Sequence, residues 1–214
     1  MTYKKIAGFF GATIWVKQAK LRNKLRNLYC NLVGKIYYRR IFKRFGYGSL
    51  LCSPLNITNP EHVSIGKHVH IGHGARLEVL TGWHGGQQFS PELEIQDGVG
   101  IGHNATIGCA NKVVIGRNTV ISFDVFITDN DHAYEQIGVP VMEQPLIVQQ
   151  TIVGENCFIA SGVKLLAGTV LGKQCIVGSN SVVRGEFPDY CVIVGAPARV
   201  VKRYSLQSRC WERV

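Results

Sequence analysis

"NCFIASGVKLLAGTVLGKQCIVGSNSVV", residues 156–183, decides the fold because an aliphatic residue returns at every sixth position. These aliphatic positions are Ile159, Leu165, Leu171, Val177 and Val183. A small residue stands four places after each of the first four: Val163, Thr169, Cys175 and Ser181. A period of six matches neither an α-helix nor the alternation of a single strand, and it is typical of a solenoid built from short repeats.

The six-residue step continues upstream in triplets of aliphatic residues. The earlier triplets are Ile65, Ile71 and Leu77; Ile95, Ile101 and Ile107; Ile115, Ile121 and Ile127; and Val153 with Ile159 and Leu165. Irregular steps separate them: 8 residues from Ile57 to Ile65, 18 from Leu77 to Ile95, 8 from Ile107 to Ile115 and 26 from Ile127 to Val153. Every irregular step follows the third member of a triplet, so all insertions leave from one position of the repeat.

If each hexapeptide forms one flat side, three of them close a triangular coil. The pattern therefore predicts an all-β solenoid, a parallel β-helix of about five coils over residues 57–185, with strands about 4.8 Å apart. The aliphatic and small positions point inward, and residues 128–150 form a long loop at one corner. Residues 186–214 form a C-terminal extension. The spacing does not define the hand, although crossover connections are usually right-handed.

Residues 1–50 form a basic arm that lies outside the repeat. Residues 1–60 contain no Asp or Glu and 12 of the 24 Lys and Arg residues, so the rest of the chain carries 12 bases against 14 acids. Apolar residues at helical spacing predict an amphipathic helix: Leu21, Leu25, Leu28, Leu32 and Ile36. Such a helix either caps the open edge of the first coil or binds anionic lipid through residues 1–44, including Phe9, Phe10 and Trp15.

Two further features bear on the compartment. The apolar run at 6–16 is shorter than the roughly 20 residues that a membrane span needs, and it lacks a convincing cleavage site. The seven cysteines are odd in number and include no C-x-x-C pair. We therefore expect reduced, mostly buried thiols in a cytoplasmic protein, with no disulfide framework and no zinc ribbon.

Three motifs together carry a resemblance to a known family. They are the tandem hexapeptides, the long loop with one histidine and the ending "VIVGAPARVVKRY" at residues 192–204. Over residues 57–204 the chain resembles the hexapeptide-repeat acyltransferases, and within them the sugar O-acetyltransferases that include the galactoside and maltose enzymes and those of surface-polysaccharide gene clusters. The resemblance implies a left-handed β-helix, a homotrimer, acetyl-CoA as the donor and active sites between neighbouring subunits.

The resemblance implies that His132 is the general base, at the tip of the loop that reaches toward a neighbouring subunit. One imidazole can remove the proton of an attacking hydroxyl and later protonate the leaving thiolate. Asp129, Asp131 or Glu135 could orient the ring through its other nitrogen. The residues alone do not choose among these acids, and a polar loop histidine on its own is more often merely solvated.

The acceptor residues are less well defined by the motif. Asn104 aligns with an acceptor-binding asparagine of the galactoside-type enzymes, and a corner-turn residue is the alternative. Asp131 and Phe158 are the other candidates for acceptor binding. The acidic pair that follows in the family is replaced here by Cys109 and Ala110, so the identity of the acceptor stays open.

The donor site is expected along the last two coils. By resemblance, Ser161 and Ser179 contact the pantetheine of acetyl-CoA, and the amides of Ala160 and Ser161 stabilise the oxyanion. The bases expected near the pyrophosphate and 3′-phosphate are Arg184, Arg199, Lys202 and Arg203. Ala196 and Pro197 should turn the chain beside the adenine.

A different chemistry is also open. Five of the seven histidines lie between residues 62 and 84, and "HVHIGH" contains the pair His68 and His73. Such a cluster could hold zinc, as in the metal-dependent carbonic anhydrases built on β-helices, and His103 shares the phase of His73 one coil later. No third ligand stands in phase, so we expect no metal and interpret these residues as surface corners. An inert binding scaffold is a third alternative.

The sequence thus predicts an acetyl-CoA-dependent O-acetyltransferase that acts on a sugar hydroxyl of a surface polysaccharide or its lipid-linked precursor. N-acetylation of an amino sugar is the nearest alternative within the class. We expect a cytoplasmic homotrimer with a saccharide or glycolipid acceptor and no nucleic-acid partner. Peripheral association with the inner face of the cytoplasmic membrane remains an alternative for the basic arm.

Overall fold

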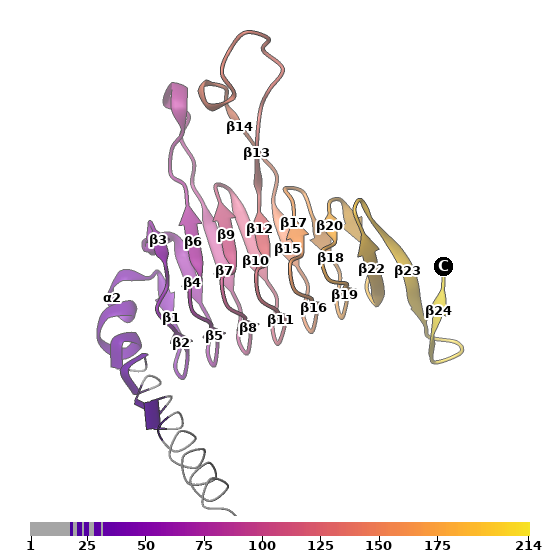
Figure 1. Ribbon diagram of the computed structural model, residues 1–214, viewed down its shortest axis with the longest axis horizontal. Helices are drawn as coiled ribbons and strands as arrows, with labels where there is room; N and C mark the ends of the chain where they lie inside the picture. Colours follow the sequence, from indigo (N-terminus) through magenta and orange to yellow (C-terminus); the bar gives the residue numbers. More distant parts are fainter. Residues whose placement is uncertain (1–17, 19–20, 23, 26–27, 31) are drawn as a thin grey trace, which may run out of the picture.

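The computed structural model describes residues 18, 21–22, 24–25, 28–30 and 32–214. The apolar run at 6–16 and the aromatic residues Phe9, Phe10 and Trp15 lie outside these residues. The chain winds into a triangular prism of three parallel sheets, from which loops project at one edge (Figure 1). The winding is that of a left-handed β-helix, as the resemblance implied and against the usual preference of crossover connections.

We name the three sides sheet A, sheet B and sheet C in the order in which the chain visits them. Sheet A consists of β1 (Arg44–Phe45), β4 (Val63–Ile65), β7 (Glu92–Ile95), β10 (Lys112–Ile115), β15 (Thr151–Val153), β18 (Val170–Leu171) and β21 (Glu186–Phe187). The parallel part of sheet B consists of β2 (Leu50–Leu51), β5 (His70–Ile71), β8 (Gly100–Ile101), β11 (Val120–Ile121), β16 (Phe158–Ile159), β19 (Ile176–Val177) and β22 (Cys191–Gly195). Sheet C consists of β3 (Asn56–Thr58), β6 (Arg76–Val79), β9 (Thr106–Cys109), β12 (Phe126–Thr128), β17 (Lys164–Leu165) and β20 (Val182–Val183).

The described residues form six complete coils and the start of a seventh, one more than the repeat count predicts. The additional coil is the first, which begins at Arg44 inside the segment expected to belong to the arm. Phe45, Leu51 and Ile57 do keep the six-residue step. An aromatic residue at the first position hides that step from a search for aliphatic residues.

Side chains at the aliphatic and small positions fill the narrow interior, as predicted. The large ones include Ile65, Leu77, Ile107, Ile127 and Leu165, all at most 1% exposed. Glycine after an aliphatic residue has a steric cause, since a Cβ at Gly154 would overlap the carbonyl oxygen of Gly172 in the next coil. The coils therefore stack too closely for a side chain there.

The described part of the arm is helical and ends as a cap on the first coil. The described residues between 18 and 33 are helical, followed by a π-helical turn (Gly34–Tyr38) and α2 (Arg39–Ile41). Tyr38, Phe42 and Phe45 are buried, with ring centroids 5.5 to 5.7 Å apart, and cover the open end of the core. The predicted apolar face at Leu21, Leu25, Leu28, Leu32 and Ile36 is instead 53–66% exposed.

Shorter elements complete the chain. Short 3-10 helices lie at Pro60–His62, His84–Gly86 and Val141–Glu143, and β13 (Asn130–His132) pairs with β14 (Leu146–Val148) in the long loop. At the C-terminus, β23 (Ala198–Ser205) and β24 (Cys210–Arg213) extend sheet B in antiparallel fashion. Six cysteines are buried, and Cys210 is exposed; all seven are free thiols. Within the described part of the chain, we find no helix long and apolar enough to cross a membrane.

Candidate active site

His132 lies at the root of the long loop, and the expectation that it stands at the tip is wrong. It ends β13, where it faces Leu146 of β14 in the antiparallel ladder, and the Ala133 amide donates to the Pro145 carbonyl over 3.0 Å. The chain from 136 to 144 forms the outer part of the loop, which projects from the prism (Figure 1). The two strands pair because the loop leaves and returns at the same corner of the prism. His132 is therefore held by regular backbone hydrogen bonds.

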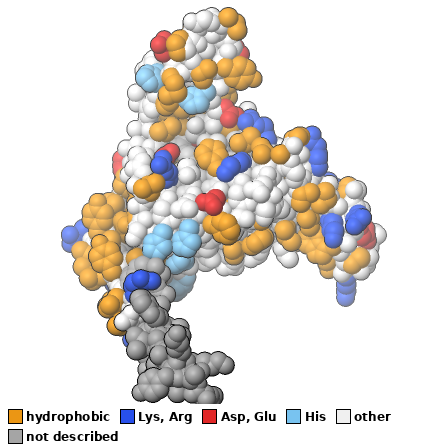
Figure 2. Space-filling view, in the orientation of Figure 1, with side chains coloured by type: hydrophobic (Ala, Val, Ile, Leu, Met, Phe, Trp, Pro, Cys, Tyr) orange, Lys and Arg blue, Asp and Glu red, His pale blue; other side chains and the backbone are white. Residues whose placement is uncertain are grey.

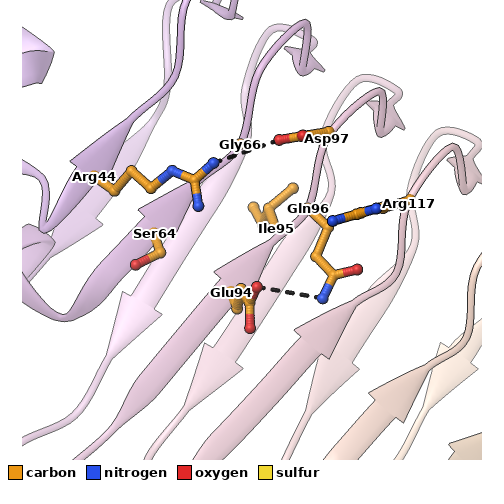
Figure 3. Close-up of a pocket in the computed structure, with 8 residues that line it drawn as sticks. All are labelled: Arg44, Ser64, Gly66, Glu94, Ile95, Gln96, Asp97 and Arg117. Atoms are coloured by element: carbon orange, nitrogen blue, oxygen red, sulfur yellow. Dashed lines mark hydrogen bonds and ion pairs between the residues drawn. The ribbon is translucent and has the colours of Figure 1, made fainter.

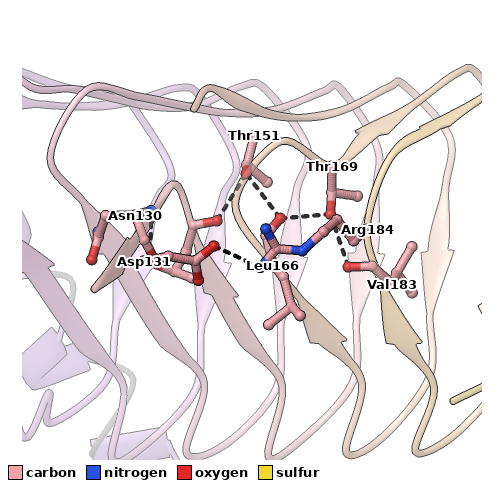
Figure 4. A network of polar contacts seen from close by, with 8 residues as sticks. Asn130, Asp131, Thr151, Leu166, Thr169, Val183 and Arg184 are labelled. Carbon is pink, nitrogen blue, oxygen red and sulfur yellow. Dashed lines mark hydrogen bonds and ion pairs between the residues drawn. The ribbon is translucent and has the colours of Figure 1, made fainter. Parts of the chain in front are cut away.

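The root of this loop is tied to the coils below it. The buried Thr151 hydroxyl donates to the carbonyl oxygen of Thr128 over 2.8 Å and lies 3.3 Å from that of Leu166 (Figure 4). The backbone N–H of Gln149 donates to the backbone carbonyl oxygen of Asp129 over 2.8 Å. Both bonds join the strand that enters the loop to the strand that leaves it. The coils therefore keep their register across the 26-residue step.

The three acids that could orient His132 have other partners. Asp129 is fully buried, and its two carboxylate oxygens accept the backbone N–H groups of Ala110 and Asn111 at 2.8 and 2.7 Å. Glu135 accepts the Tyr134 amide at 3.0 Å. Among the residues that the structure describes, none hydrogen-bonds to the His132 imidazole. The geometry therefore does not support the expectation that one of these acids orients the ring.

The third acid, Asp131, forms an ion pair with Arg184. The Asp131 Oδ2 and Arg184 Nη2 atoms are 2.6 Å apart, and both side chains are partly exposed (Figure 4). The pair joins the strand that carries His132 to the corner after β20, two coils along the prism. Arg184 was expected beside the phosphates of the donor, so the structure brings together two residues that the sequence assigned to different sites.

An open pocket surrounds these groups. Its lining consists of Asp131, His132, Tyr134, Glu135, Ile147, Gln149 and Arg184. It contains an exposed imidazole, two acids and one guanidinium, which are groups able to accept a proton from a hydroxyl and to hold a polar ligand. Figure 2 shows histidine and hydrophobic side chains together on the projecting loops above the prism.

Trp83 is a neighbour of His132 that the sequence analysis missed. The centroids of the two rings are 5.2 Å apart at an interplanar angle of 64°, an edge-to-face contact. Trp83 belongs to the insertion 80–91, whose 18-residue step leaves from the same corner as the long loop. The shared corner was the one sequence feature that pointed to this contact. It indicates that the two insertions lie near each other, but not which of their side chains meet.

Asn104 occupies a turn at the corner between sheets B and C. Its φ angle of 57° is left-handed, and its side chain donates to Asp124 Oδ1 over 3.1 Å. The equivalent residues of other coils share that backbone conformation: Gly74, Asp124, Gly162 and Asn180. Asn and Asp adopt this region more readily than other non-glycine residues, so Asn104 has a structural role, and its contact with an acceptor stays a prediction.

Phe158 lies on the outer face of sheet B and is 45% exposed. It stands in a column of exposed apolar side chains, paired in register with Val120 on one side and Ile176 on the other. Neither Phe158 nor Asn104 lines the pocket at His132. Within one chain, Asp131 is therefore the one predicted acceptor residue that shares a pocket with the predicted base.

The donor residues Ser161 and Ser179 stack at the corner between sheets B and C, with hydroxyl oxygens 3.5 Å apart. The Ala160 amide donates to the Val177 carbonyl over 3.0 Å, so it is not available to an oxyanion. The Ser161 amide has no acceptor in the part of the chain that the structure describes. The oxyanion role thus stays predicted for Ser161 alone.

The C-terminal motif forms a hairpin. Ala196 and Pro197, joined by a cis peptide bond, make the turn between β22 and β23. Arg199, Lys202 and Arg203 lie exposed along β23. Arg184 is not part of this group, because it lies at the corner after sheet C and is paired with Asp131.

Another depression lies on sheet A and is lined by Arg44, Ser64, Gly66, Glu94, Ile95, Gln96, Asp97 and Arg117 (Figure 3). Its polar groups bind one another: Arg44 lies 3.6 Å from Asp97, and Gln96 donates to Glu94 over 3.2 Å. The Lys67 amide also donates to Asp97 and holds the pKa of that carboxyl below its usual value. The depression has no histidine or thiol, so it is a less suitable place for acyl transfer.

The histidine pair behaves as its phase predicts. The rings of His73 and His103 stack with centroids 5.4 Å apart and an interplanar angle of 14°. His68 instead contacts the ring of Tyr47. Over the described residues, no three His, Cys, Asp or Glu side chains are grouped so that they could hold a metal ion.

Comparison with known proteins identifies relatives of most of the chain. The family model described as bacterial transferase hexapeptide (six repeats) matches residues 150–185. A protein of Escherichia coli K12 named as a lipopolysaccharide biosynthesis O-acetyl transferase, WbbJ, is 31% identical over 192 residues, which cover 86% of this chain and 93% of WbbJ. A protein of Mycobacterium tuberculosis named as an acetyltransferase, Rv3034c, is 33% identical over 70% of this chain and 46% of its own length.

The solved structures agree on the fold. AntD, an N-acyltransferase from Bacillus cereus solved with dTDP-4-amino-4,6-dideoxyglucose and coenzyme A, superposes with a TM-score of 0.64 at 17% identity, over 78% of this chain and 87% of AntD. At that identity the likeness concerns the fold alone. The repeat, the prism and the identity to WbbJ over most of both chains lead to one conclusion: the chain is an acyltransferase and belongs to the hexapeptide-repeat acyltransferase family.

Proposed function

We propose that the protein transfers an acetyl group from acetyl-CoA to a hydroxyl group of a sugar. The sugar is part of a surface polysaccharide or of its lipid-linked precursor. The observation that carries the proposal is the exposed His132 imidazole, which lies in an open polar pocket on a residue whose backbone is held by strand pairing. The likeness to WbbJ, named for lipopolysaccharide biosynthesis and O-acetyl transfer, supports the acceptor class.

In this reaction His132 accepts the proton of the sugar hydroxyl as its oxygen attacks the thioester carbonyl. The Ser161 amide donates to the carbonyl oxygen as negative charge develops there. The C–S bond then breaks, and the imidazolium of His132 returns the proton to the thiolate of coenzyme A. The products are an acetyl ester and a free thiol, so protons and electrons balance without a metal or redox partner.

The donor lies along the last coils in this proposal. Ser161 and Ser179 hold the pantetheine, with Ala160 beside it. Arg199, Lys202 and Arg203 attract the phosphates, whose charge suits exposed bases on one strand. Ala196 and Pro197 form the turn next to the adenine.

A homotrimer would complete the site. Ser161 and Ser179 lie at one corner of the prism and His132 above another, so the donor corner of one chain must meet the loop of a second. The exposed column of Val120, Phe158 and Ile176 on sheet B is an apolar surface that a neighbour would cover. Sedimentation should give three times the 23.7 kDa mass of the chain; a monomer at assay concentration would contradict this arrangement.

The arm would hold the enzyme at the cytoplasmic face of the membrane. The exposed leucine face, with basic residues and no acid in the first 60 positions, suits an anionic lipid surface. Co-sedimentation with anionic liposomes at low salt tests this part of the proposal. If the full chain stays in the supernatant, the lipid role of the arm is wrong.

The reaction is tested by release of free thiol from acetyl-CoA in the presence of methyl glycosides, glycolipids and an amino sugar nucleotide. We expect release with a hydroxyl acceptor and an acetylated product detected by mass. Mild alkali cleaves an ester and leaves an amide, so the same product distinguishes O-acetyl from N-acetyl transfer. Absence of thiol release with every acceptor would refute the proposal.

A further inference from the structure

The insertion at residues 80–91 lies against the loop that carries His132. It connects β6 to β7 and folds back on itself through a bridge between Gly82 and Gln88. In Figure 1 it projects from the same edge of the prism as the β13–β14 loop. Two of its side chains, Trp83 and Gln87, bind the longer loop directly.

Gln87 acts as an extra strand partner for β14. Its Nε2 atom donates to the Leu146 carbonyl and its Oε1 atom accepts the Leu146 amide, each over 2.9 Å. A single side chain thereby satisfies both backbone groups of the residue that faces His132 across the ladder. Gln87 and His132 therefore lie on opposite sides of Leu146, and the side-chain amide fixes the position of the strand that supports the base.

Trp83, like Gln87, is hydrogen-bonded to the longer loop. Its indole N–H donates to the Gln144 carbonyl over 3.1 Å. Gln144 is itself buried and bonds to Gln136 and Val139, so the indole is attached to an ordered part of the loop. With its N–H occupied, the partly exposed Trp83 offers only an apolar ring surface beside His132.

We propose that Trp83, in the insertion 80–91, forms one wall of the acceptor site and contacts the acceptor sugar, and that Gln87 is a positioning residue. The inference rests on the proposed function, because a hydroxyl that gives its proton to His132 must lie within hydrogen-bond reach of the imidazole. The indole centroid is 5.2 Å from that imidazole, so the pyranose ring that carries the hydroxyl lies against Trp83. The C–H groups on the face of a pyranose are apolar and suit an aromatic surface.

The test uses the full chain, acetyl-CoA and the methyl pyranosides of glucose, galactose, mannose and N-acetylglucosamine, followed by thiol release. With the best of these acceptors, Trp83→Leu should raise the acceptor KM by about threefold to tenfold and leave the acetyl-CoA KM unchanged. Trp83→Phe keeps an aromatic face and should stay near the wild-type acceptor KM. A purely structural role would change both KM values or neither.

Gln87 is tested with a matched control in the same insertion. Gln87→Leu should lower kcat and speed backbone amide exchange in β14, and Gln87→Glu, which can accept but not donate, should fall between it and the wild type. Gln88 is exposed and makes no side-chain hydrogen bond within the described residues, so Gln88→Leu should change neither quantity.

The outcomes separate this inference from the proposed function. If His132→Ala abolishes transfer while Trp83→Leu keeps the wild-type acceptor KM, the function stands and the wall is wrong. Equal amide exchange in Gln87→Leu and Gln88→Leu would overturn the positioning role. A wild-type chain that acetylates none of the four glycosides would count against the proposed function and remove the basis of the wall.

Discussion

The ion pair between Asp131 and Arg184 gives a decisive experiment, because sequence and structure assign Arg184 different partners. The motif predicts a phosphate of acetyl-CoA, and the structure pairs Arg184 Nη2 with Asp131 Oδ2 at 2.6 Å, next to His132. Arg184→Met removes the charge and keeps most of the length of the side chain. Asp131→Asn removes the opposite charge with almost no change in shape.

The expected effect is small, because the side chains of Arg184 and Asp131 are 49% and 35% exposed. Ion pairs with this exposure contribute about 0.2–1 kcal/mol. The melting temperature should therefore fall by less than about 4 °C in a chain of this size. If the whole energy serves to hold Asp131 beside His132 during catalysis, kcat falls by at most about fivefold.

A double-mutant cycle in the thiol-release assay distinguishes the two assignments. If the pair acts as a unit, either single variant lowers kcat to the same extent, the double variant is no slower than the singles, and the acetyl-CoA KM does not change. If Arg184 instead binds a donor phosphate, Arg184→Met alone raises the acetyl-CoA KM. An increase of about tenfold or more in that variant, absent from Asp131→Asn, would refute our reading of the ion pair.

Further outcomes are expected from three other sites. His132→Ala should lower kcat by about 10²-fold or more with acetyl-CoA affinity nearly unchanged, while His84→Ala, which removes another exposed histidine next to Trp83, should keep activity; equal activity of the two variants would contradict the general base. Thr151→Val should lower the free energy of unfolding by about 1–3 kcal/mol, measured by urea titration, because the Thr128 carbonyl loses a buried donor. The Lys43 hydrogen bond holds the pKa of Glu92 below its usual value of 4.5, so the stability that this carboxylate contributes is present above that pH and is lost as the pH falls through the folded pKa. The difference in stability between wild type and Glu92→Gln should accordingly shrink in acid, and a difference that is constant with pH would contradict the assignment.

Much of the fold could be predicted because the repeat is a direct consequence of stacking. Only aliphatic or small side chains fit inside the prism, so positions such as Ile65 and Leu165 reveal the coils. The first coil was missed because an aromatic residue, Phe45, takes its inward position, where an aliphatic residue is expected. Phe45 packs there against Tyr38 and Phe42. The same irregular steps revealed the corner from which the loops leave.

The contacts around His132 could not be predicted, since they join side chains to residues remote in sequence. Gln87 binds the backbone of Leu146. Because every residue type has this backbone carbonyl, the identity of residue 146 does not indicate the contact. Asp129 looked as suitable as Asp131 for orienting the ring. Only the structure shows that its carboxylate is occupied by the amides of Ala110 and Asn111.

The geometry of the prism explains why the two insertions meet. They leave from the same corner after β6 and after β12, two coils apart, which corresponds to about 10 Å along the axis at the usual strand spacing. A tryptophan or glutamine side chain can cover that distance only if the corner between them, at residues 108–111, stays short. Asp129 binds that short corner through the amides of Ala110 and Asn111. The 8-residue step from Ile107 to Ile115 is thus as necessary to the site as the 26-residue step that carries His132, because lengthening it would separate Trp83 from the imidazole.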